Sequence, residues 1–196
     1  MSGSPQVRRA DKLMTEERAR ETLERGFCGR LATVGEDGWA YCVPLLYVCM
    51  DGQIFVHNTR ARGHLRANVD HEPRVCFEID EAGEVFAYGR FECDSTVEYR
   101  SVVVFGRIRV VEDLATRQRF FDALMAKYAK KDWKRPKGFY PRIDQITLYA
   151  ITVERMSGKE TPCLRPRSAG RRWITPSRRT RAHRDCGANT ALRSGF

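Results

Sequence analysis

The sequence has no apolar run of 18 or more residues, so it predicts no transmembrane helix and no membrane partner. Its first residues, Met1 to Arg9, lack the apolar stretch of a signal peptide, and a cytoplasmic location is therefore expected. No Cys-x-x-Cys pair occurs among the seven cysteines, which predicts buried reduced thiols and no metal site. The dinucleotide-binding motif Gly-x-Gly-x-x-Gly is also absent.

The net charge of +10 is concentrated in the C-terminal tail. Residues 161–196 contain nine Arg, one Asp and no Lys or Glu, which is a charge of +8 and leaves +2 for residues 1–160. Since the rest of the chain is nearly neutral, nucleic acid is not an expected partner of the folded part. The tail has no hydrophobic period and is expected to be disordered. Two interpretations of it stay open, a natural RNA-binding tail and an altered reading frame after Pro162.

Length and pattern predict one domain with two tails. Residues 1–13 are expected to be a flexible tail, residues 14–160 the domain, and residues 161–196 the basic tail. The domain should begin with a helix that Thr15 caps and Gly26 ends. The apolar residues on one face of this helix are Leu13, Ala19, Leu23 and Phe27.

Two strands joined by a tight turn should follow this helix. The first is Gly29–Val34, and the Asp37-Gly38 pair after it is typical of a hairpin turn. The second is Tyr41–Val48, in which Pro44 lacks the N–H for a ladder hydrogen bond. This strand should therefore lie at a sheet edge, or contain a bulge or kink of the kind that can present backbone groups to a ligand. The cysteines expected in the core are Cys42, Cys49 and Cys76.

The remaining pattern predicts few helices and several more strands. Further strands are expected at Ile54–Val56, Arg74–Ile79, Tyr99–Val111 and Gln145–Val153, with helices at Gly63–Asn68 and after Asp113. Residues 80–98 are less regular, and Gly106 suggests a bend of the kind that barrels need. The expected fold class is mainly β with peripheral helices, in which about six mostly antiparallel strands close into a small barrel.

One short stretch, Phe55–Leu65, carries an unusual density of polar groups. It offers two imidazoles, an amide, a hydroxyl and two guanidiniums where a strand should give way to a helix. Backbone N–H groups at the start of a helix are unpaired and favour anions. The stretch is therefore a candidate phosphate site.

Residues 14–160 resemble the FMN-binding split-barrel flavoproteins related to pyridoxamine 5'-phosphate oxidase, especially the branch that contains nitroimidazole-resistance proteins. No single motif is specific, but their order and spacing match over most of the chain. The matching segments are Gly29–Val34, Asp37-Gly38, Val43–Tyr47, Phe55–Asn58, Pro73–Glu78, Tyr99–Arg107 and Ser157–Glu160.

The resemblance implies a split β-barrel and a homodimer with FMN in clefts at the subunit interface. It implies that the strand Val43–Tyr47 lies against the edge of the isoalloxazine ring and that His57, the candidate catalytic residue, lies near the reactive ring. Arg62 and His64 would hold the phosphate. The cofactor-binding residues implied in this way are Val43, Pro44, Leu45, Leu46, Tyr47, His57, Asn58, Thr59, Arg62, His64, Leu65, Arg100 and Ser101, the last two from the second subunit.

These residues also have structural interpretations. His57 follows two apolar strand residues and could be an ordinary core histidine. The amide and hydroxyl that follow it could cap the next helix. Arg62 and His64 could be a solvated helix start, and Arg100 could be a surface charge.

The chain departs from the family pattern in two places. Arg62, Gly63 and His64 stand where the family usually has an Arg-Lys pair on the phosphate, so one cation is weaker and pH-sensitive, unless Arg60 compensates. The C-terminal Trp and Arg-rich motif of the true oxidases has no match at Trp173, so vitamin B6 synthesis is not expected.

The expected function is that of an FMN-dependent oxidoreductase that reduces a small flat substrate, such as a nitroaromatic or a quinone, with NADH or NADPH as a candidate donor. The alternatives are a flavin-binding or flavin-storage module without turnover and, because of the basic tail alone, a nucleic-acid-binding protein.

Overall fold

The computed structural model describes residues 7–88, 90–134 and 136–162. From residue 163 onward, the basic tail lies outside the described residues, and its disorder stays a prediction. Near the N-terminus, the 3-10 turn η1 spans Ala10–Lys12, and the Met14 N–H donates to the Gly158 carbonyl at 3.0 Å. The flexibility of residues 1–13 stays a prediction.

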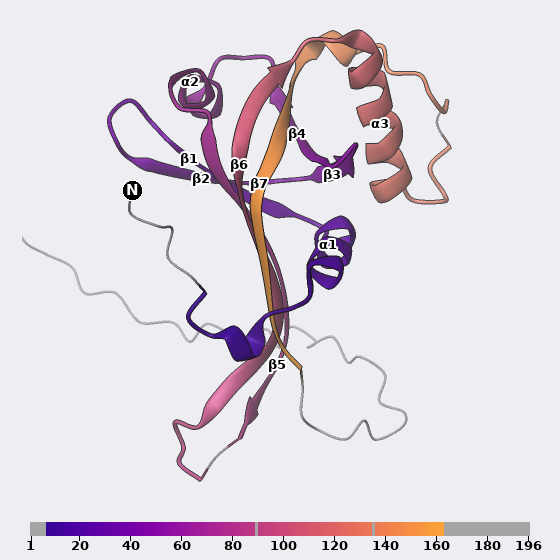
Figure 1. Ribbon diagram of the computed structural model, residues 1–196. Coiled ribbons are helices and arrows are strands. Elements are labelled where there is room, and N and C mark those ends of the chain that lie inside the picture. The colour runs from indigo at the N-terminus through magenta and orange to yellow at the C-terminus, as the bar shows by residue number, and fades with distance from the viewer. Residues whose placement is uncertain (1–6, 89, 135, 163–196) are drawn as a thin grey trace, which may run out of the picture. The chain divides into compact units, whose positions relative to one another are not determined.

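Seven strands form one sheet in the order β2-β1-β5-β6-β7-β4-β3 (Figure 1). They are β1 Gly29–Val34, β2 Ala40–Leu45, β3 Tyr47–Met50, β4 Gln53–Thr59, β5 Arg74–Ala87, β6 Ser95–Val111 and β7 Ile146–Thr161. All neighbouring pairs are antiparallel. The predicted mainly β split barrel is confirmed, but the sheet has seven strands and stays open between β2 and β3, whereas about six strands in a closed barrel were expected.

The expected strand Tyr41–Val48 is two strands, because the chain crosses from one edge of the sheet to the other at Leu46. β2 pairs only with β1, and Pro44 stands opposite Arg30. An edge strand has one side without a ladder partner, which is where a proline is tolerated. The edge position expected from Pro44 is confirmed. β3 begins at the fully buried Tyr47 and pairs with β4 at the other edge.

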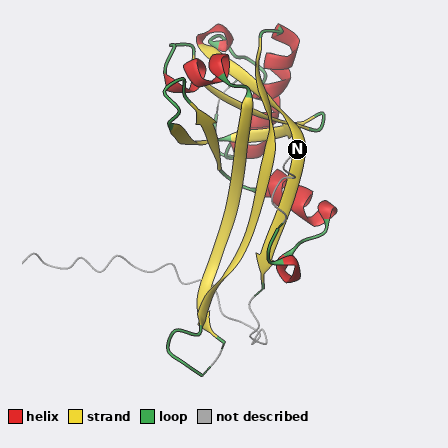
Figure 2. Ribbon diagram, turned by 60° about the vertical axis from the view of Figure 1, so that its left-hand side comes forward, coloured by secondary structure: helices red, strands yellow, loops and turns green. Residues whose placement is uncertain are grey.

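The strands β5, β6 and β7 form a long antiparallel ribbon (Figure 2). β5 reaches Ala87, with a register shift between Ala82 and Val85, so much of the segment expected to be irregular is strand. β7 continues past Val153 to Thr161 although its second half is polar. The residue types of this polar half do not predict a strand. Pairing with β6 stabilises it as one, since strand formation depends on the neighbours as much as on the residue types.

The bend expected at Gly106 is confirmed as a register shift between β6 and β7. A Cβ at this position would collide with the carbonyl oxygen of Thr152, so only glycine allows the two backbones to approach. Beyond the bend the strand alternates as predicted, with Arg107 and Arg109 exposed and Ile108 buried.

The helices are α1 Glu16–Arg25, α2 His64–His71 and α3 Leu114–Tyr128, with a 3-10 turn η2 at Ile143–Gln145. Thr15 caps α1 by accepting the Arg18 N–H at 3.3 Å, and Asp113 caps α3 by accepting the Thr116 N–H at 2.7 Å. The prediction that Phe27 continues the buried face of α1 is wrong. Its side chain is 74% exposed, because α1 has already ended at Gly26.

Apolar side chains of β4 alternate between two cores. Val56 faces the larger core, where the rings of Tyr47 and Phe77 meet edge to face at 5.0 Å. Phe55 faces the smaller core beneath α3, together with Phe120. Because neighbouring side chains of a strand point to opposite faces, this alternation also fixes the faces of the polar residues at the end of β4.

Candidate functional site

The chain passes from β4 to α2 through a short basic turn. Within it, the Arg60 N–H donates to the Gln145 carbonyl at 3.0 Å, which ties the turn to the start of β7. Gly63 is the N-cap of α2 and has no side chain that could accept the first N–H groups of the helix. The start of α2 is therefore a favourable place for an anion, next to two guanidiniums.

His57 lies beneath α3 among aromatic rings. Its ring centroid is 5.3 Å from that of Phe120 and 6.2 Å from that of Phe121. The Nδ1 atom is buried and has no hydrogen-bond partner. Burial lowers the pKa of His57 below the ordinary value of 6.5, so the ring is neutral at pH 7. A buried polar atom without a partner is rare in folded proteins and points to a ligand or a bound water.

Asn58 lies on the opposite face of β4. Its side-chain Oδ1 is also buried without a hydrogen-bond partner, and Thr147 of β7 stands opposite it in the sheet. Thr59 ends the strand and is exposed. Because His57 and Asn58 point to opposite faces, the structure does not bring these two side chains together on one ligand ring.

Arg62 and His64 flank the start of α2 but are turned toward other residues. Arg62 Nη2 is 2.9 Å from Asp70 Oδ2, and the Arg62 side chain is 69% exposed, so solvent screens this ion pair. The ring of His64 stacks on that of Tyr41 at a centroid distance of 5.4 Å and an interplanar angle of 22°. Leu65 is buried in the larger core. Arg62 alone among these three can turn to an anion by giving up an exposed ion pair.

The residues from Val43 to Tyr47, which are predicted to contact the flavin, do not all face the same side. Val43 and Leu45 are half-buried and pack against the larger core. Pro44 and Leu46 are exposed, and Leu46 marks the crossover between the two edge strands. Tyr47 is fully buried. The surface that this segment offers to a ligand therefore comes from Pro44 and Leu46.

Arg100 and Ser101 lie far from the β4–α2 junction of the same chain. Arg100 contacts Glu160 at 3.4 Å and Glu81 at 3.5 Å. Along β7, Glu160 is separated from Leu148, the ladder partner of His57, by roughly 40 Å of strand. Arg100 could therefore reach such a site only in a second subunit.

The family model described as Pyridoxamine 5'-phosphate oxidase matches residues 15–160. The chain belongs to the pyridoxamine 5'-phosphate oxidase family. A search of the curated proteins gives no match.

Solved structures share the fold of this family member. A FAD-binding protein from Mesorhizobium loti is 26% identical, with a TM-score of 0.55 over 76% of this chain and 97% of that chain. A candidate 5-nitroimidazole antibiotic resistance protein from Bacteroides thetaiotaomicron is 16% identical, with a TM-score of 0.62 over 75% and 85% of the two chains. The FAD and heme binding protein from Mycobacterium smegmatis is 22% identical, with a TM-score of 0.65 over 76% and 73%. The resemblance seen in the sequence is thereby confirmed.

This member of the pyridoxamine 5'-phosphate oxidase family also has an open cleft that its sequence does not predict. The cleft has a volume of about 620 Å³ and lies between the β1–β2 hairpin and α2. Its lining residues are Gly35, Glu36, Asp37, Trp39, Ala40, Tyr41, His64 and Asn68. The residues that could have indicated this cleft are Trp39 and Tyr41, two aromatic residues close after the Asp37-Gly38 turn. A second cavity, beside Cys49, has about 140 Å³ and is smaller than typical small-molecule sites.

The cysteines of the described residues are all free thiols. The prediction that Cys42 is a core residue is wrong, because it lies on the outward face of the edge strand β2 and is exposed. Within the described ranges, no group of three or more His, Cys, Asp or Glu is placed to hold a metal ion. No helix in this part of the chain is both long enough and apolar enough to cross a membrane.

Proposed function

We propose that the chain is an FMN-binding flavoprotein that reduces a small flat substrate, such as a nitroaromatic or a quinone. One observation carries the proposal. The start of α2 lacks a side-chain cap and is preceded by Arg60 and Arg62, in a member of the pyridoxamine 5'-phosphate oxidase family. This donor set suits a phosphate group, which is how FMN would be anchored.

The residues at the junction fit this cofactor. Arg62 would bind the phosphate together with the first N–H groups of α2. The buried Oδ1 of Asn58 lacks a partner and could accept a hydroxyl of the ribityl chain, with Thr59 beside it. The backbone next to Pro44 would border the ring system. Family membership and the FAD-binding relatives named above support a flavin at this place.

A bound flavin would supply hydride or single-electron transfer. The protein would position the ring and exclude water from it. His57, neutral at pH 7 because burial lowers its pKa, would keep its proton on one ring nitrogen and offer the other as an acceptor. This is the basis for proposing His57 as a residue that contacts the flavin or the substrate.

We also propose that the working form is a homodimer with the flavin at the subunit interface. Arg100 and Ser101 lie too far along the ribbon to reach the junction of their own chain, and a second subunit would have to supply them. Measuring the molar mass in solution by light scattering tests this directly. A monomer that nevertheless binds flavin fully would remove Arg100 and Ser101 from the site.

Anaerobic reduction distinguishes an enzyme from a storage module. The flavin-loaded protein is mixed with NADH or NADPH without oxygen, and the visible absorption is followed. An oxidoreductase should bleach and regain its colour when a nitroaromatic or a quinone is added. A protein that binds flavin but shows neither change is a flavin-binding module.

The same preparation decides between FMN and FAD. Two relatives are FAD-binding proteins by description, whereas the junction offers its arginines to a single phosphate. Mass spectrometry of the flavin released by acid identifies the cofactor. FAD in place of FMN would keep the flavoprotein proposal and replace its cofactor.

A further inference from the structure

The α3–η2 loop, residues 129–142, concentrates positive charge within a domain whose net charge is small. It contains four Lys, two Arg and one Asp, a net charge of +5. Since residues 1–160 together carry +2, the remainder of the domain carries −3. We propose that this loop binds single-stranded nucleic acid, with its basic side chains on the phosphates and its exposed rings on the bases.

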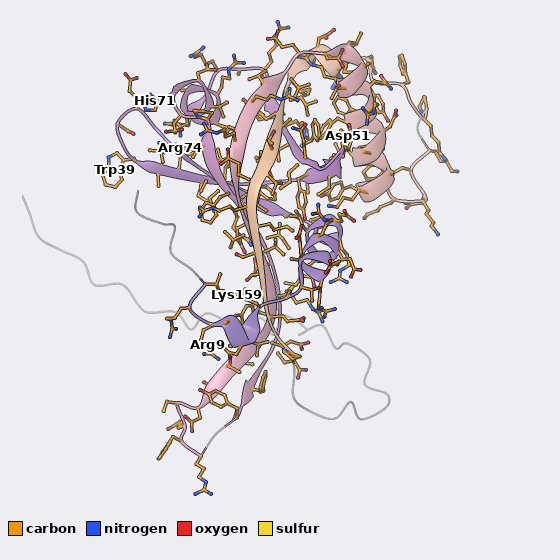
Figure 3. All side chains as sticks on the ribbon, in the orientation of Figure 1. Arg9, Trp39, Asp51, His71, Arg74 and Lys159 are labelled. Carbon is orange, nitrogen blue, oxygen red and sulfur yellow. The ribbon has the colours of Figure 1, made fainter. Side chains whose placement is uncertain are left out.

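The cations of the α3–η2 loop lack the carboxylate partners that many other surface cations have. Arg107 pairs with Glu154 at 2.8 Å, and Arg119 pairs at 2.7 Å with Asp51, which lies beside α3 (Figure 3). Five exposed cations of the loop form no ion pair with a described carboxylate: Lys130, Lys131, Lys134, Lys137 and Arg142. These like charges repel each other, and an anionic partner would relieve the repulsion.

The nearby carboxylates are already engaged. Asp122 of α3 accepts the hydroxyl of Tyr140 at 2.8 Å, and Asp144 of η2 lies 3.7 Å from Arg117. Neither pairs with a cation of the loop. The positive charge of the loop therefore stays available to a partner from outside the domain.

The loop runs back along α3 (Figure 1). Gln118 Nε2 donates to the Gly138 carbonyl at 3.4 Å, and the Tyr140 ring stacks on Phe121 at a centroid distance of 5.0 Å. Gln118 and Tyr128, after which the loop begins, are separated by roughly 15 Å of helix. The cations are thus spread over a length that one phosphate cannot span and that a chain of phosphates can follow.

Exposed rings stand among these cations. Trp133 is 44% exposed, and Phe139, directly before the stacked Tyr140, is 65% exposed. Rings interleaved with cations suit a single strand, because its unpaired bases can stack on them, whereas a duplex hides the faces of its bases. The loop has no Leu, Ile, Val or Met, so it lacks the aliphatic area with which a membrane-binding segment inserts. The inference goes beyond the proposed function, since no flavin has to be bound for it to hold.

Fluorescence anisotropy of a labelled oligothymidine strand of about twelve nucleotides, titrated with the full chain, tests the proposal. The quadruple variant Lys130→Gln, Lys131→Gln, Lys134→Gln and Lys137→Gln should bind at least about tenfold more weakly at low salt. The slope of log affinity against log salt should become shallower by about 2 to 3, because each phosphate contact on a single strand contributes about 0.7.

The matched control removes the same charge from cations that have partners. It combines four substitutions: Arg9→Gln, Arg20→Gln, Arg107→Gln and Arg119→Gln. This variant should lose less than about threefold in affinity. Residues 161–196 are present in every variant, so their own contribution does not change. If the lysine variant keeps wild-type affinity, or the control loses as much, the strand does not bind to this loop.

A second pair of variants separates stacking from charge. Phe139→Ala should weaken oligonucleotide binding at least about fivefold and leave the binding of heparin, a polyanion without bases, unchanged. Phe91→Ala, at the 74% exposed ring between β5 and β6, is the control and should change neither. No loss in Phe139→Ala, an equal loss for heparin, or binding of the wild type to phosphatidylserine vesicles alone overturns the proposal. Unchanged circular dichroism shows that each variant is folded.

Discussion

The hydroxyl oxygen of Tyr128 lies 2.8 Å from the carbonyl oxygen of Tyr47 and accepts the Tyr47 N–H at 3.3 Å. The last residue of α3 thereby pairs with the first residue of the edge strand β3. At this point the chain has just crossed from the β2 edge of the sheet, and no strand is available on the outer side of β3. A side chain supplies the hydrogen bonds that a neighbouring strand would otherwise provide.

Removing this hydroxyl should destabilise the domain. Tyr128→Phe removes the partner of the polar backbone atoms of Tyr47 and of the Phe27 carbonyl oxygen, which also lies 2.8 Å from the hydroxyl oxygen, at an expected cost of about 1–3 kcal/mol. Urea denaturation should show a lower midpoint with an unchanged slope. Tyr140→Phe is the control, because the hydroxyl of Tyr140 bonds to the exposed Asp122, and its loss should cost less than about 0.5 kcal/mol. Equal losses in the free energy of unfolding for the two variants would show that the hydrogen bonds of the Tyr128 hydroxyl stabilise the domain no more than an exposed hydrogen bond does.

The pH dependence of stability should report on His57. Burial holds its folded-state pKa below 6.5, so as the pH falls through this value the unfolded chain takes up a proton that the folded chain does not. The wild type should therefore lose stability relative to His57→Leu below about pH 6.5, by at most about 1.4 kcal/mol per pH unit, until the folded-state pKa is reached. Above about pH 7.5 the difference should be constant.

Denaturation curves of both proteins between about pH 5 and pH 8 measure this difference. Since carboxylates titrate alike in both proteins, subtracting the two curves isolates the histidine. Parallel curves throughout would show that the imidazole has the same pKa in the folded and unfolded chain.

Gly106 should not tolerate a side chain. In Gly106→Ala the new methyl group meets the carbonyl of Thr152 in the register shift between β6 and β7, and backbone cannot move aside as a flexible side chain can. We expect a loss of roughly 1–3 kcal/mol in the free energy of unfolding. Gly63→Ala is the control, because a Cβ there meets no atom within 4 Å. Because replacing glycine lowers the entropy of the unfolded chain and by itself stabilises the fold, a loss of similar size in the control would show that the collision is not the cause.

Arg62→Ala should lower flavin affinity about tenfold while leaving stability nearly unchanged. The ion pair that it breaks is exposed, and Asp70 keeps Arg66 as a partner at 2.9 Å. Fluorescence titration with FMN measures the affinity. Arg20→Ala removes a comparable exposed guanidinium paired with Glu16 on α1 and serves as the control. Wild-type affinity in Arg62→Ala would move the phosphate away from the start of α2.

Features of the fold that depend on near neighbours could be predicted from the sequence. The caps at Thr15 and Asp113 involve residues three positions apart, and the bend at Gly106 follows from a glycine inside a strong strand. The break at Leu46 could not be predicted, because it is set by two strands at opposite edges of the sheet. The extension of β7 to Thr161 is likewise set by pairing with distant parts of β6.

In the candidate site, too, some features could be predicted from the local sequence and others could not. The anion-favouring junction follows from residue types at a strand-to-helix change. The opposite faces of His57 and Asn58 follow from the period of a strand. The stacking of His64 on Tyr41 brings together residues from α2 and β2, and no local sequence pattern predicts it. The cleft beside it, with Trp39 at its margin, therefore became visible only in the structure.

The most direct test of the central claim is the visible absorption spectrum of the purified full-length chain after incubation with FMN and removal of unbound cofactor. We expect a yellow protein with the two absorption bands of an oxidised flavin and about one flavin per chain. A colourless protein that takes up neither added FMN nor added FAD would contradict the account.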